Sequence, residues 1–224
     1  MWVDQLWRYP VKSLGGESLT AATVGVLGVV GDRFLAVHDE RDEVTWAGAI
    51  PALVTVRAVT IDAGVAELIQ PDGGRFRSDA PDASGRLSAA VAAEVKLVAH
   101  RPDRPDAAVH VLTTTSLASL GSALPDSAID ATRFRPNLVL DGVVDQAYPE
   151  HRWIGRRMAI GALHVRFTEG CERCVTITKE TPTVPHDRAV LRWVARELGN
   201  TFGVYAAVEV PGRVRVGDEA RWLD

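Results

Sequence analysis

Cysteine is scarce in this chain: among 224 residues, only Cys171 and Cys174 carry a thiol. A small secreted domain that depends on disulfides contains far more cysteine. A ferredoxin-type iron–sulfur cluster takes four thiolate ligands. The sequence therefore excludes both a disulfide-rich scaffold and a built-in iron–sulfur electron carrier of that type.

Long apolar runs and an excess of positive charge are also missing. The longest mostly apolar stretch, residues 21–30, is far shorter than the roughly 20 residues that a membrane helix needs. The N-terminus has neither the basic segment nor the apolar core of a signal peptide. With 25 Lys and Arg against 29 Asp and Glu, the net charge of −4 argues against nucleic acid as a partner. We expect a soluble cytoplasmic protein without a membrane span, whose thiols stay reduced.

Short strand-like segments outnumber helical ones along the chain. β-branched and apolar residues alternate or cluster between turn residues, which is typical of strands. Strands are expected at residues 2–8, 33–38, 53–60, 65–69, 75–78, 95–99, 137–140, 163–167, 175–178, 204–210 and 214–222, the last two as a closing hairpin. Helices are expected at 84–94 and 117–124, and after His186 and Asp187. The Pro-rich, charged stretch 101–106 divides the chain into expected domains 1–100 and 101–224, and the whole indicates a β-rich α+β fold.

The cysteine pair allows four interpretations. A structural zinc site needs about four ligands, and the nearby histidines lack the usual spacing. A thioredoxin-like dithiol opens a helix, whereas a β-branched run follows Cys174. The two residues could also be buried structural cysteines. The fourth interpretation is a thiolate ligand or sulfur carrier, with the adjacent Arg173 favouring the charged form.

Basic residues outside the helices fall in three turn-flanked clusters: Lys12-Ser13, Asp32-Arg33 and residues 133–137. Lys and Arg beside Ser and Asn supply the charge-assisted donors that bind phosphate or a polyanionic cofactor. Each cluster alone is better explained as a solvated loop charge. Together with a soft thiolate, they are typical of a site for a phosphorylated ligand that carries a soft metal.

Several short motifs occur in a family-specific order: Tyr9-Pro-Val-Lys-Ser13, Gly31-Asp-Arg33, Arg133-Phe-Arg-Pro-Asn-Leu138, Trp153-Ile-Gly155, Cys171-Glu-Arg-Cys174, Phe202-Gly-Val-Tyr205 and Val216-Gly-Asp218. In this order the chain resembles the MOSC superfamily (molybdenum cofactor sulfurase C-terminal domain). The similarity extends to the mitochondrial amidoxime-reducing component and its bacterial relatives. It implies a MOSC-type β-barrel with flanking helices, interlocked with an N-terminal β-barrel-like region.

The resemblance implies the following site residues. Cys174 matches the second family cysteine and would be the protein ligand to molybdenum, the catalytic metal. The molybdenum cofactor, molybdopterin, would be held by Lys12, Ser13, Arg33, Thr113, Thr115, Ser116, Arg135, Asn137, Arg173 and Tyr205. The chain departs from the family at Glu172, where Ser or Thr is common, and at residues 46–51, where relatives often carry a basic residue.

The activity that the resemblance implies is reduction of the N–O bond in small N-hydroxylated molecules. Because the chain has no iron–sulfur cluster of its own, electrons would come from a separate ferredoxin- or cytochrome-type donor protein and its reductase. Two alternatives remain open. Cys174 could carry persulfide sulfur for maturation of a metal cofactor, or the protein could bind the molybdenum cofactor without catalysis.

Overall fold

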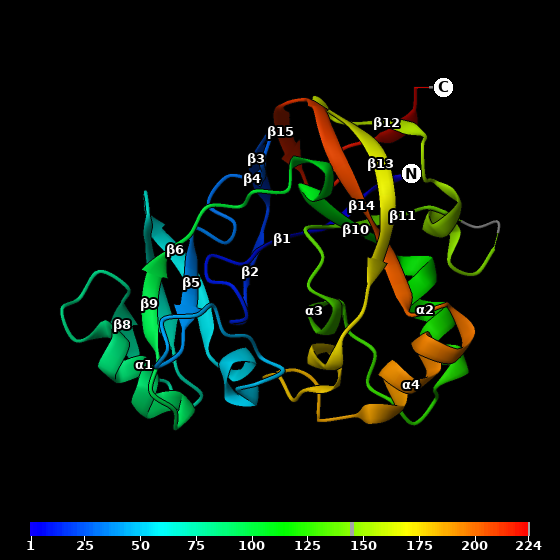
Figure 1. The fold of residues 1–224 in the computed structure, drawn as a ribbon. Coiled ribbons are helices and arrows are strands. Elements are labelled where there is room, and N and C mark those ends of the chain that lie inside the picture. Colours follow the sequence, from blue (N-terminus) through cyan, green and yellow to red (C-terminus); the bar gives the residue numbers. More distant parts are fainter. Residues whose placement is uncertain (144–145, 224) are drawn as a thin grey trace.

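The computed structural model describes residues 1–143 and 146–223, and its largest element is an eight-stranded sheet (Figure 1). The strand order is β16-β12-β13-β14-β10-β11-β1-β2. These strands are β1 (Trp2–Arg8), β2 (Glu17–Leu19), β10 (Val109–Thr113), β11 (Leu138–Asp141), β12 (Arg157–Ile160), β13 (Leu163–Glu172), β14 (Thr201–Val210) and β16 (Ala220–Trp222). β10 and β11 run parallel, and the other neighbouring pairs are antiparallel. Segments from the two ends of the chain therefore share one sheet.

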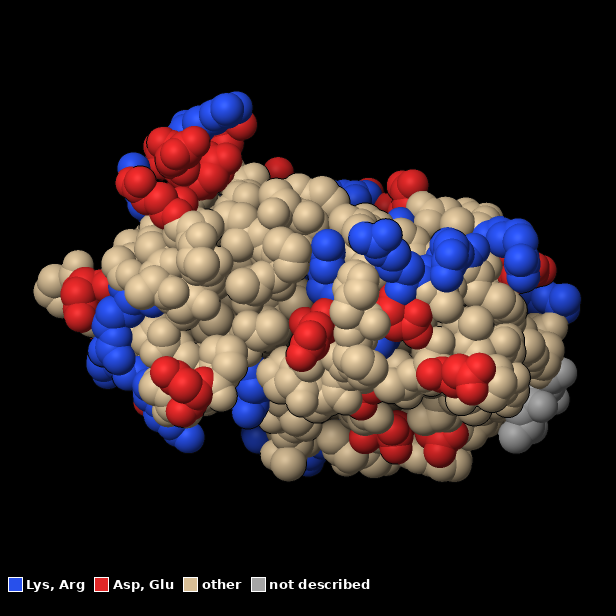
Figure 2. Space-filling view, turned by 90° about the horizontal axis from the view of Figure 1, so that it is seen from below, with Lys and Arg blue, Asp and Glu red and all other residues tan. Residues whose placement is uncertain are grey.

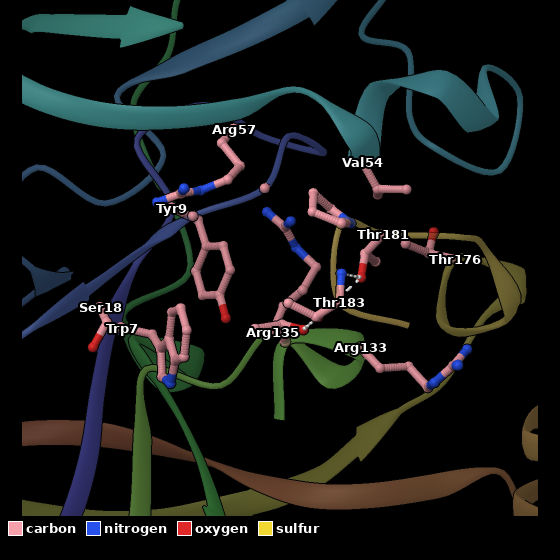
Figure 3. Close-up of a pocket in the computed structure, with 14 residues that line it drawn as sticks. Trp7, Tyr9, Ser18, Val54, Arg57, Arg133, Arg135, Thr176, Thr181 and Thr183 are labelled. Carbon is pink, nitrogen blue, oxygen red and sulfur yellow. Dashed lines mark hydrogen bonds between the residues drawn. The ribbon is translucent and has the colours of Figure 1, made fainter. Parts of the chain in front are cut away.

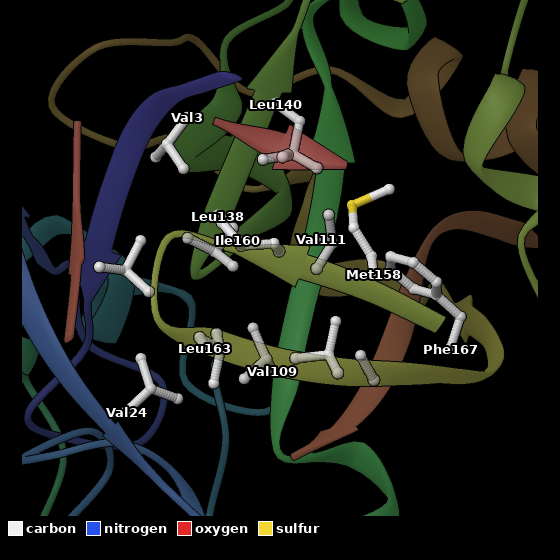
Figure 4. Close-up of a cluster of buried hydrophobic side chains, with 14 of the residues drawn as sticks. Val3, Val24, Val109, Val111, Leu138, Leu140, Met158, Ile160, Leu163 and Phe167 are labelled. Carbon is white, nitrogen blue, oxygen red and sulfur yellow. The ribbon is translucent and has the colours of Figure 1, made fainter. Parts of the chain in front are cut away.

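Strict alternation in β13 directs one face of this sheet into the main core. Leu163, Val165 and Phe167 are buried, whereas His164 and Arg166 lie on the more exposed face, as the sequence predicts. Figure 4 shows Leu163 and Phe167 among side chains from β1, β10, β11 and β12. Val3 of β1 lies in the same core. Burial of these apolar groups stabilises the sheet by roughly 25 cal/mol per Å² removed from water.

Smaller sheets make up the N-terminal region. β3 (Ala21–Gly25) lies between β4 (Gly28–Val29) and β15 (Gly212–Arg215); β5 (Leu35–His38) pairs with β9 (Lys96–Ala99); and β6 (Arg57–Asp62), β7 (Val65–Ile69) and β8 (Arg75–Arg77) form a meander. Helix α1 (Ala83–Val91) packs against them. A second core, which includes Leu53, Leu68, Phe76 and Leu87, fills this region.

Three further helices follow: α2 (Thr114–Ala123) and α4 (Arg188–Glu197) lie at the lower right of Figure 1, and the short α3 (Ala131–Phe134) lies near the centre of the view. Thr113 caps α2 and Asp187 caps α4, each through a side-chain oxygen that accepts a backbone N–H. A third core joins α4 to the strands and includes Ile177, Val190, Val194 and Phe202. Within the described residues, no helix is both long enough and apolar enough to cross a bilayer.

The predicted β-rich class is confirmed, with 38% strand and 22% helix. The hairpin at 65–69 and 75–78 is present as β7 and β8. The division at residue 100 stays a prediction; β1 and β2 belong to the same sheet as the C-terminal strands.

Three predicted elements are wrong. The strand at 53–60 starts as the 3₁₀ helix η1 (Pro51–Thr55), because Pro51 is favourable in a first helical turn, and only β6 is extended. Residues 175–178 form the 3₁₀ helix η4 (Val175–Thr178), in which the Thr178 hydroxyl donates to the Val175 carbonyl and so favours a turn. The closing hairpin does not form, because β15 pairs with β3 and β16 pairs with β12.

Candidate functional site

The candidate site lies where the loops of the N-terminal region meet the segment between α3 and β11 and the segment after β13. Three of its predicted residues, Ser13, Arg33 and Arg135, have positive φ angles of 72°, 49° and 58°. A left-handed backbone at a non-glycine residue costs on the order of 1 kcal/mol, and such residues cluster at functional sites. Here the conformation is held by backbone bonds, since Arg33 N–H donates to the Tyr9 carbonyl (2.7 Å) and Arg135 N–H donates to the Ala131 carbonyl (3.1 Å).

Two arginines lie against the ring of Tyr9. The guanidinium carbons of Arg135 and Arg33 lie 4.3 and 5.4 Å from the ring centroid. Asp32 pairs with Arg33 and accepts the Tyr9 N–H at 2.7 Å. Burial, reinforced by the nearby charge of Arg33, lowers the pKa of Arg135 to about 10. Burial also raises the pKa of Tyr9, so its hydroxyl stays protonated as a donor.

A second polar group surrounds the buried cysteine. Arg173 donates from Nη1 to Cys171 Sγ at 2.7 Å and from Nη2 to the Phe134 carbonyl at 2.8 Å. Burial opposes ionisation of the Cys171 thiol, but the charges of His110 and Arg173 outweigh it and lower its pKa to about 6. Burial, together with the negative charge on Cys171, raises the pKa of Tyr205 to about 12. Cys171 is therefore a thiolate at neutral pH that neutralises part of this basic cluster.

Cys174 occupies a different environment, although it is only three residues away. Its side chain is exposed, and its thiol lies 3.4 Å from the Thr176 hydroxyl. The residue immediately precedes η4, and the Ile177 N–H bonds back to its carbonyl at 3.2 Å. Of the two thiols, the exposed one is free to meet a ligand or substrate.

Two cavities lie beside Arg33 and Arg135. The first, which we call the aromatic cavity, has a volume of about 220 Å³, and Trp7, Tyr9 and Arg135 line it together with Thr176 and Thr183 (Figure 3). Figure 3 shows the Arg135 side chain running alongside the Tyr9 ring. The second, the polar cavity, has a volume of about 320 Å³; its lining includes Lys12, Asp32, Arg33, His110, Asn137 and Tyr205. Residues from both predicted domains therefore line each cavity.

Four buried polar atoms of this cluster have no hydrogen-bond partner within the described part of the chain: Tyr9 Oη, Arg135 Nη2, Arg173 Nε and His110 Nε2. An unsatisfied buried polar group costs about 1–3 kcal/mol. Four such atoms in one cluster therefore need an explanation. Three of the four are N–H or O–H donors, and two belong to guanidinium groups. An anionic ligand with several acceptor oxygens would satisfy them.

The structure brings together only some of the residues that the resemblance implies. Lys12, Arg33, Asn137 and Tyr205 line the polar cavity, and Arg135 lines the aromatic cavity. Ser13 is buried on the Lys12 loop. Arg173 lies against Cys171, as described above. Asn137 also has a structural role, because its side chain accepts the His110 N–H at 3.1 Å.

The hydroxyl-rich segment is engaged elsewhere. Thr113 and Ser116 both donate to one carboxylate oxygen of the fully buried Glu150, at 2.9 and 2.6 Å. Thr115 donates to the Val143 carbonyl. None of the three lines the aromatic or the polar cavity. Their assignment to the cofactor stays a prediction from the resemblance.

Sequence reasoning missed Tyr9, His110, Cys171 and Glu150 as members of these clusters. Tyr9 could have been found, because it opens the Tyr-Pro-Val-Lys-Ser motif that was used for Lys12. Cys171 was considered only as one half of a pair. The pairing of β10 with β14 places His110 beside Tyr205, and no local sequence pattern predicts this contact.

A purely protein-based metal centre finds no support in the part of the chain that the structure describes. It contains no group of three or more His, Cys, Asp or Glu side chains that could hold a metal ion. A metal at this site would have Cys174 as its thiolate and would need its other ligands from a cofactor.

Two protein-family models match this chain. A model of the MOSC domain matches residues 98–221, and a model of the MOSC N-terminal beta barrel domain matches residues 1–118. The chain belongs to the MOSC domain family. In this family member, the two cavities are lined from both matched regions.

Curated relatives and solved structures extend the comparison. The chain is 26% identical to mitochondrial amidoxime-reducing component 1 of Mus musculus, over 96% of this chain and 80% of that protein. It is also 26% identical to mitochondrial amidoxime reducing component 2 of Homo sapiens, over 96% of this chain and 82% of that protein. The crystal structure of the YuaD protein from Bacillus subtilis superimposes with a TM-score of 0.54 at 12% identity, over 97% and 92% of the two chains. The YuaD structure thus shares the fold across nearly the whole chain.

Proposed function

We propose that this protein binds the molybdenum cofactor and reduces the N–O bond of small N-hydroxylated molecules. The observation that carries the proposal is the set of buried, unpartnered donors on Tyr9, Arg135 and Arg173, together with the exposed thiol of Cys174, which lies two residues before Thr176 in the wall of the aromatic cavity. The relatives named amidoxime-reducing components support the reaction class.

The residues present fit this cofactor. Molybdopterin ends in a phosphate, and the site concentrates Lys12, Arg33 and Arg135 with three hydrogen-bond donors that lack partners within the described residues. A thiolate from Cys174 is the soft ligand that such a metal takes. When bound, the cofactor supplies a two-electron redox centre.

The roles of the chain's own residues follow from their positions. Arg33 and Arg135 neutralise the anionic cofactor, while Tyr9 and Arg173 donate hydrogen bonds to it. Cys171, as a buried thiolate, fixes Arg173 in place through the 2.7 Å contact. The overall reaction takes R–NH–OH, two electrons and two protons to R–NH₂ and water. The electrons come from a separate ferredoxin- or cytochrome-type protein with its own reductase, since two cysteines cannot supply the four thiolates of a ferredoxin-type cluster.

A single-turnover assay tests this function. Protein produced with ample molybdate is mixed with a chemical reductant and an N-hydroxylated aromatic substrate, and the amine product is measured. Wild type should form amine, Cys174→Ala should lose turnover by at least 100-fold, and Cys171→Ala should lose less. Absence of product with metal-loaded protein would contradict the proposal. A labile +32 Da adduct on Cys174 without bound pterin would point instead to persulfide transfer.

A further inference from the structure

Helix α4 carries three arginines on one exposed face. Arg188, Arg192 and Arg196 follow each other at intervals of four residues, and all three are exposed. Four residues advance a helix by about 6 Å, so the three form a stripe of about 12 Å along α4. Figure 2 views the molecule from below, the side on which α4 lies in Figure 1, and shows a row of Lys and Arg side chains across the right half of this face, with Asp and Glu side chains beside it. We call these three residues the arginine stripe.

Part of the charge on the arginine stripe is unfavourable for its own helix. Arg188 lies in the first turn, where the helix dipole favours negative charge, and no acidic residue follows it in that turn. The pairs Arg188/Arg192 and Arg192/Arg196 place like charges four residues apart, which costs a few tenths of a kcal/mol each. Arg196 lies in the last turn, where the dipole favours a cation, and pairs with Glu197 at 2.5 Å. Burial opposes ionisation of the capping Asp187, but hydrogen bonds and nearby charges, among them that of Arg192, lower its pKa. A row of three exposed arginines that the helix does not need for its own stability, in a chain of net charge −4, is consistent with a function outside folding.

The apolar face of α4, opposite the arginine stripe, packs against η4, the segment that follows Cys174. Val190 and Val194 are fully buried and share a core with Ile177 of η4. The Asp187 N–H at the start of the helix donates to the Thr178 carbonyl at the end of η4, at 2.8 Å. Cys174 is exposed and immediately precedes η4, so the helix that carries the stripe packs directly on the segment that follows this cysteine.

We propose that the arginine stripe is the docking surface for an acidic face of the protein that delivers electrons to this site. The inference rests on the proposed function, which requires such a donor. Complementary charge steers a transient redox partner and sets its association rate, whereas it adds little to permanent affinity. A lipid surface fits less well, because the apolar face of α4 is already buried in the core and cannot insert into a bilayer. Three charges also provide few phosphate contacts for nucleic acid.

The test uses two arms on the cofactor-loaded protein. In the first arm, binding to a plant-type [2Fe–2S] ferredoxin and to a soluble cytochrome b5 domain is measured at 20 and 200 mM salt without turnover. In the second arm, reduction of an N-hydroxylated substrate is driven either by these reduced carriers or by a small chemical reductant. The variant is Arg188→Glu/Arg192→Glu/Arg196→Glu. The control, Arg213→Glu/Arg215→Glu/Arg221→Glu, changes the charge equally on exposed positions of β15 and β16, at the other end of the molecule in Figure 1.

For at least one of the carriers, the stripe variant should bind at least tenfold more weakly than wild type at low salt, with a flatter salt dependence. Its rate with that carrier should fall by a similar factor, while its rate with the chemical reductant stays unchanged, and the control should match wild type throughout. Equal losses in both variants, or no loss in the stripe variant, would overturn the docking surface. The proposal would also be overturned if the stripe variant lost only binding to anionic vesicles or to duplex DNA, measured in the same way. Failure of the proposed function would look different: wild type itself would give no product with the chemical reductant.

Discussion

At the scale of single residues, a substitution of Tyr9 tests whether its hydroxyl serves ligand binding or the stability of the fold. Its hydroxyl is buried without a hydrogen-bond partner in the described structure, so it contributes nothing favourable to the stability of the ligand-free protein. We predict that Tyr9→Phe leaves the free energy of unfolding unchanged or raises it by about 1 kcal/mol. The same change should lower the fraction of purified protein that retains pterin, measured by fluorescence. Tyr148→Phe, in the third core, serves as the control and should retain pterin as wild type does.

The thiol of Cys171 links stability to pH. Its pKa in the folded protein is lowered to about 6 from an ordinary value near 9. A group whose folded pKa is depressed contributes stability that is complete above its unfolded pKa and is lost as pH falls through the folded pKa. We predict that wild type gains stability over Cys171→Ser as pH rises from 6 to 9, measured by urea unfolding. Cys174→Ser, at an exposed position, should show no such trend; a parallel trend in both variants would contradict this role for Cys171.

At the scale of elements, Arg133 holds the segment that follows Cys174. Its side chain is 2% exposed and donates to the carbonyls of Ile177 (2.7 Å), Pro185 (3.0 Å) and Ala128 (3.3 Å). Replacement by Met would leave the Ile177 carbonyl buried without this donor, at a cost of about 1–3 kcal/mol, and would remove the part-buried bonds to Pro185 and Ala128. We predict that Arg133→Met lowers the free energy of unfolding by at least about 2 kcal/mol and increases proteolysis within residues 177–185. The exposed Arg213→Met should change stability by less than about 0.5 kcal/mol.

Local patterns predicted most elements but not how they pair. The alternation of residues 163–167 identified β13 and its two faces, because a half-buried strand imposes a period of two. Residues 175–178 have the β-branched composition of a strand yet form a turn, since hydrogen bonds local to η4 decide their geometry. The partner of β15 is β3, almost 190 residues earlier, and no turn signal encodes such a pairing.

In the candidate site, too, local motifs predicted some residues, and the contacts between them required the structure. Lys12, Arg33, Asn137 and Tyr205 could be chosen from motifs, and they line one cavity. The contact between Arg135 and Tyr9 depends on tertiary structure, as does the one between Cys171 and Arg173. Motifs therefore identified charged residues, while the buried partners that set their pKa values required the structure.

At the scale of the whole molecule, the two family regions share one sheet. β1 pairs with β11 and contributes Val3 and Leu6 to the main core. We predict that residues 101–224 alone lack fixed tertiary packing, seen as loss of the near-ultraviolet circular dichroism signal, and that residues 1–100 added in trans restore it. Cleavage of the intact chain at the exposed Arg101 should leave the two pieces associated. Independent cooperative folding of residues 101–224 would contradict this interdependence.

The most direct test of the central claim is the molybdenum and pterin content of the purified protein. From a host supplied with molybdate, wild type should carry close to one molybdenum and one pterin per chain. Arg135→Ala should lose most of both, because it removes a cation and a buried donor that the ligand would engage. Wild-type protein that contains neither molybdenum nor pterin, while its fold is intact, would contradict a molybdenum-cofactor site.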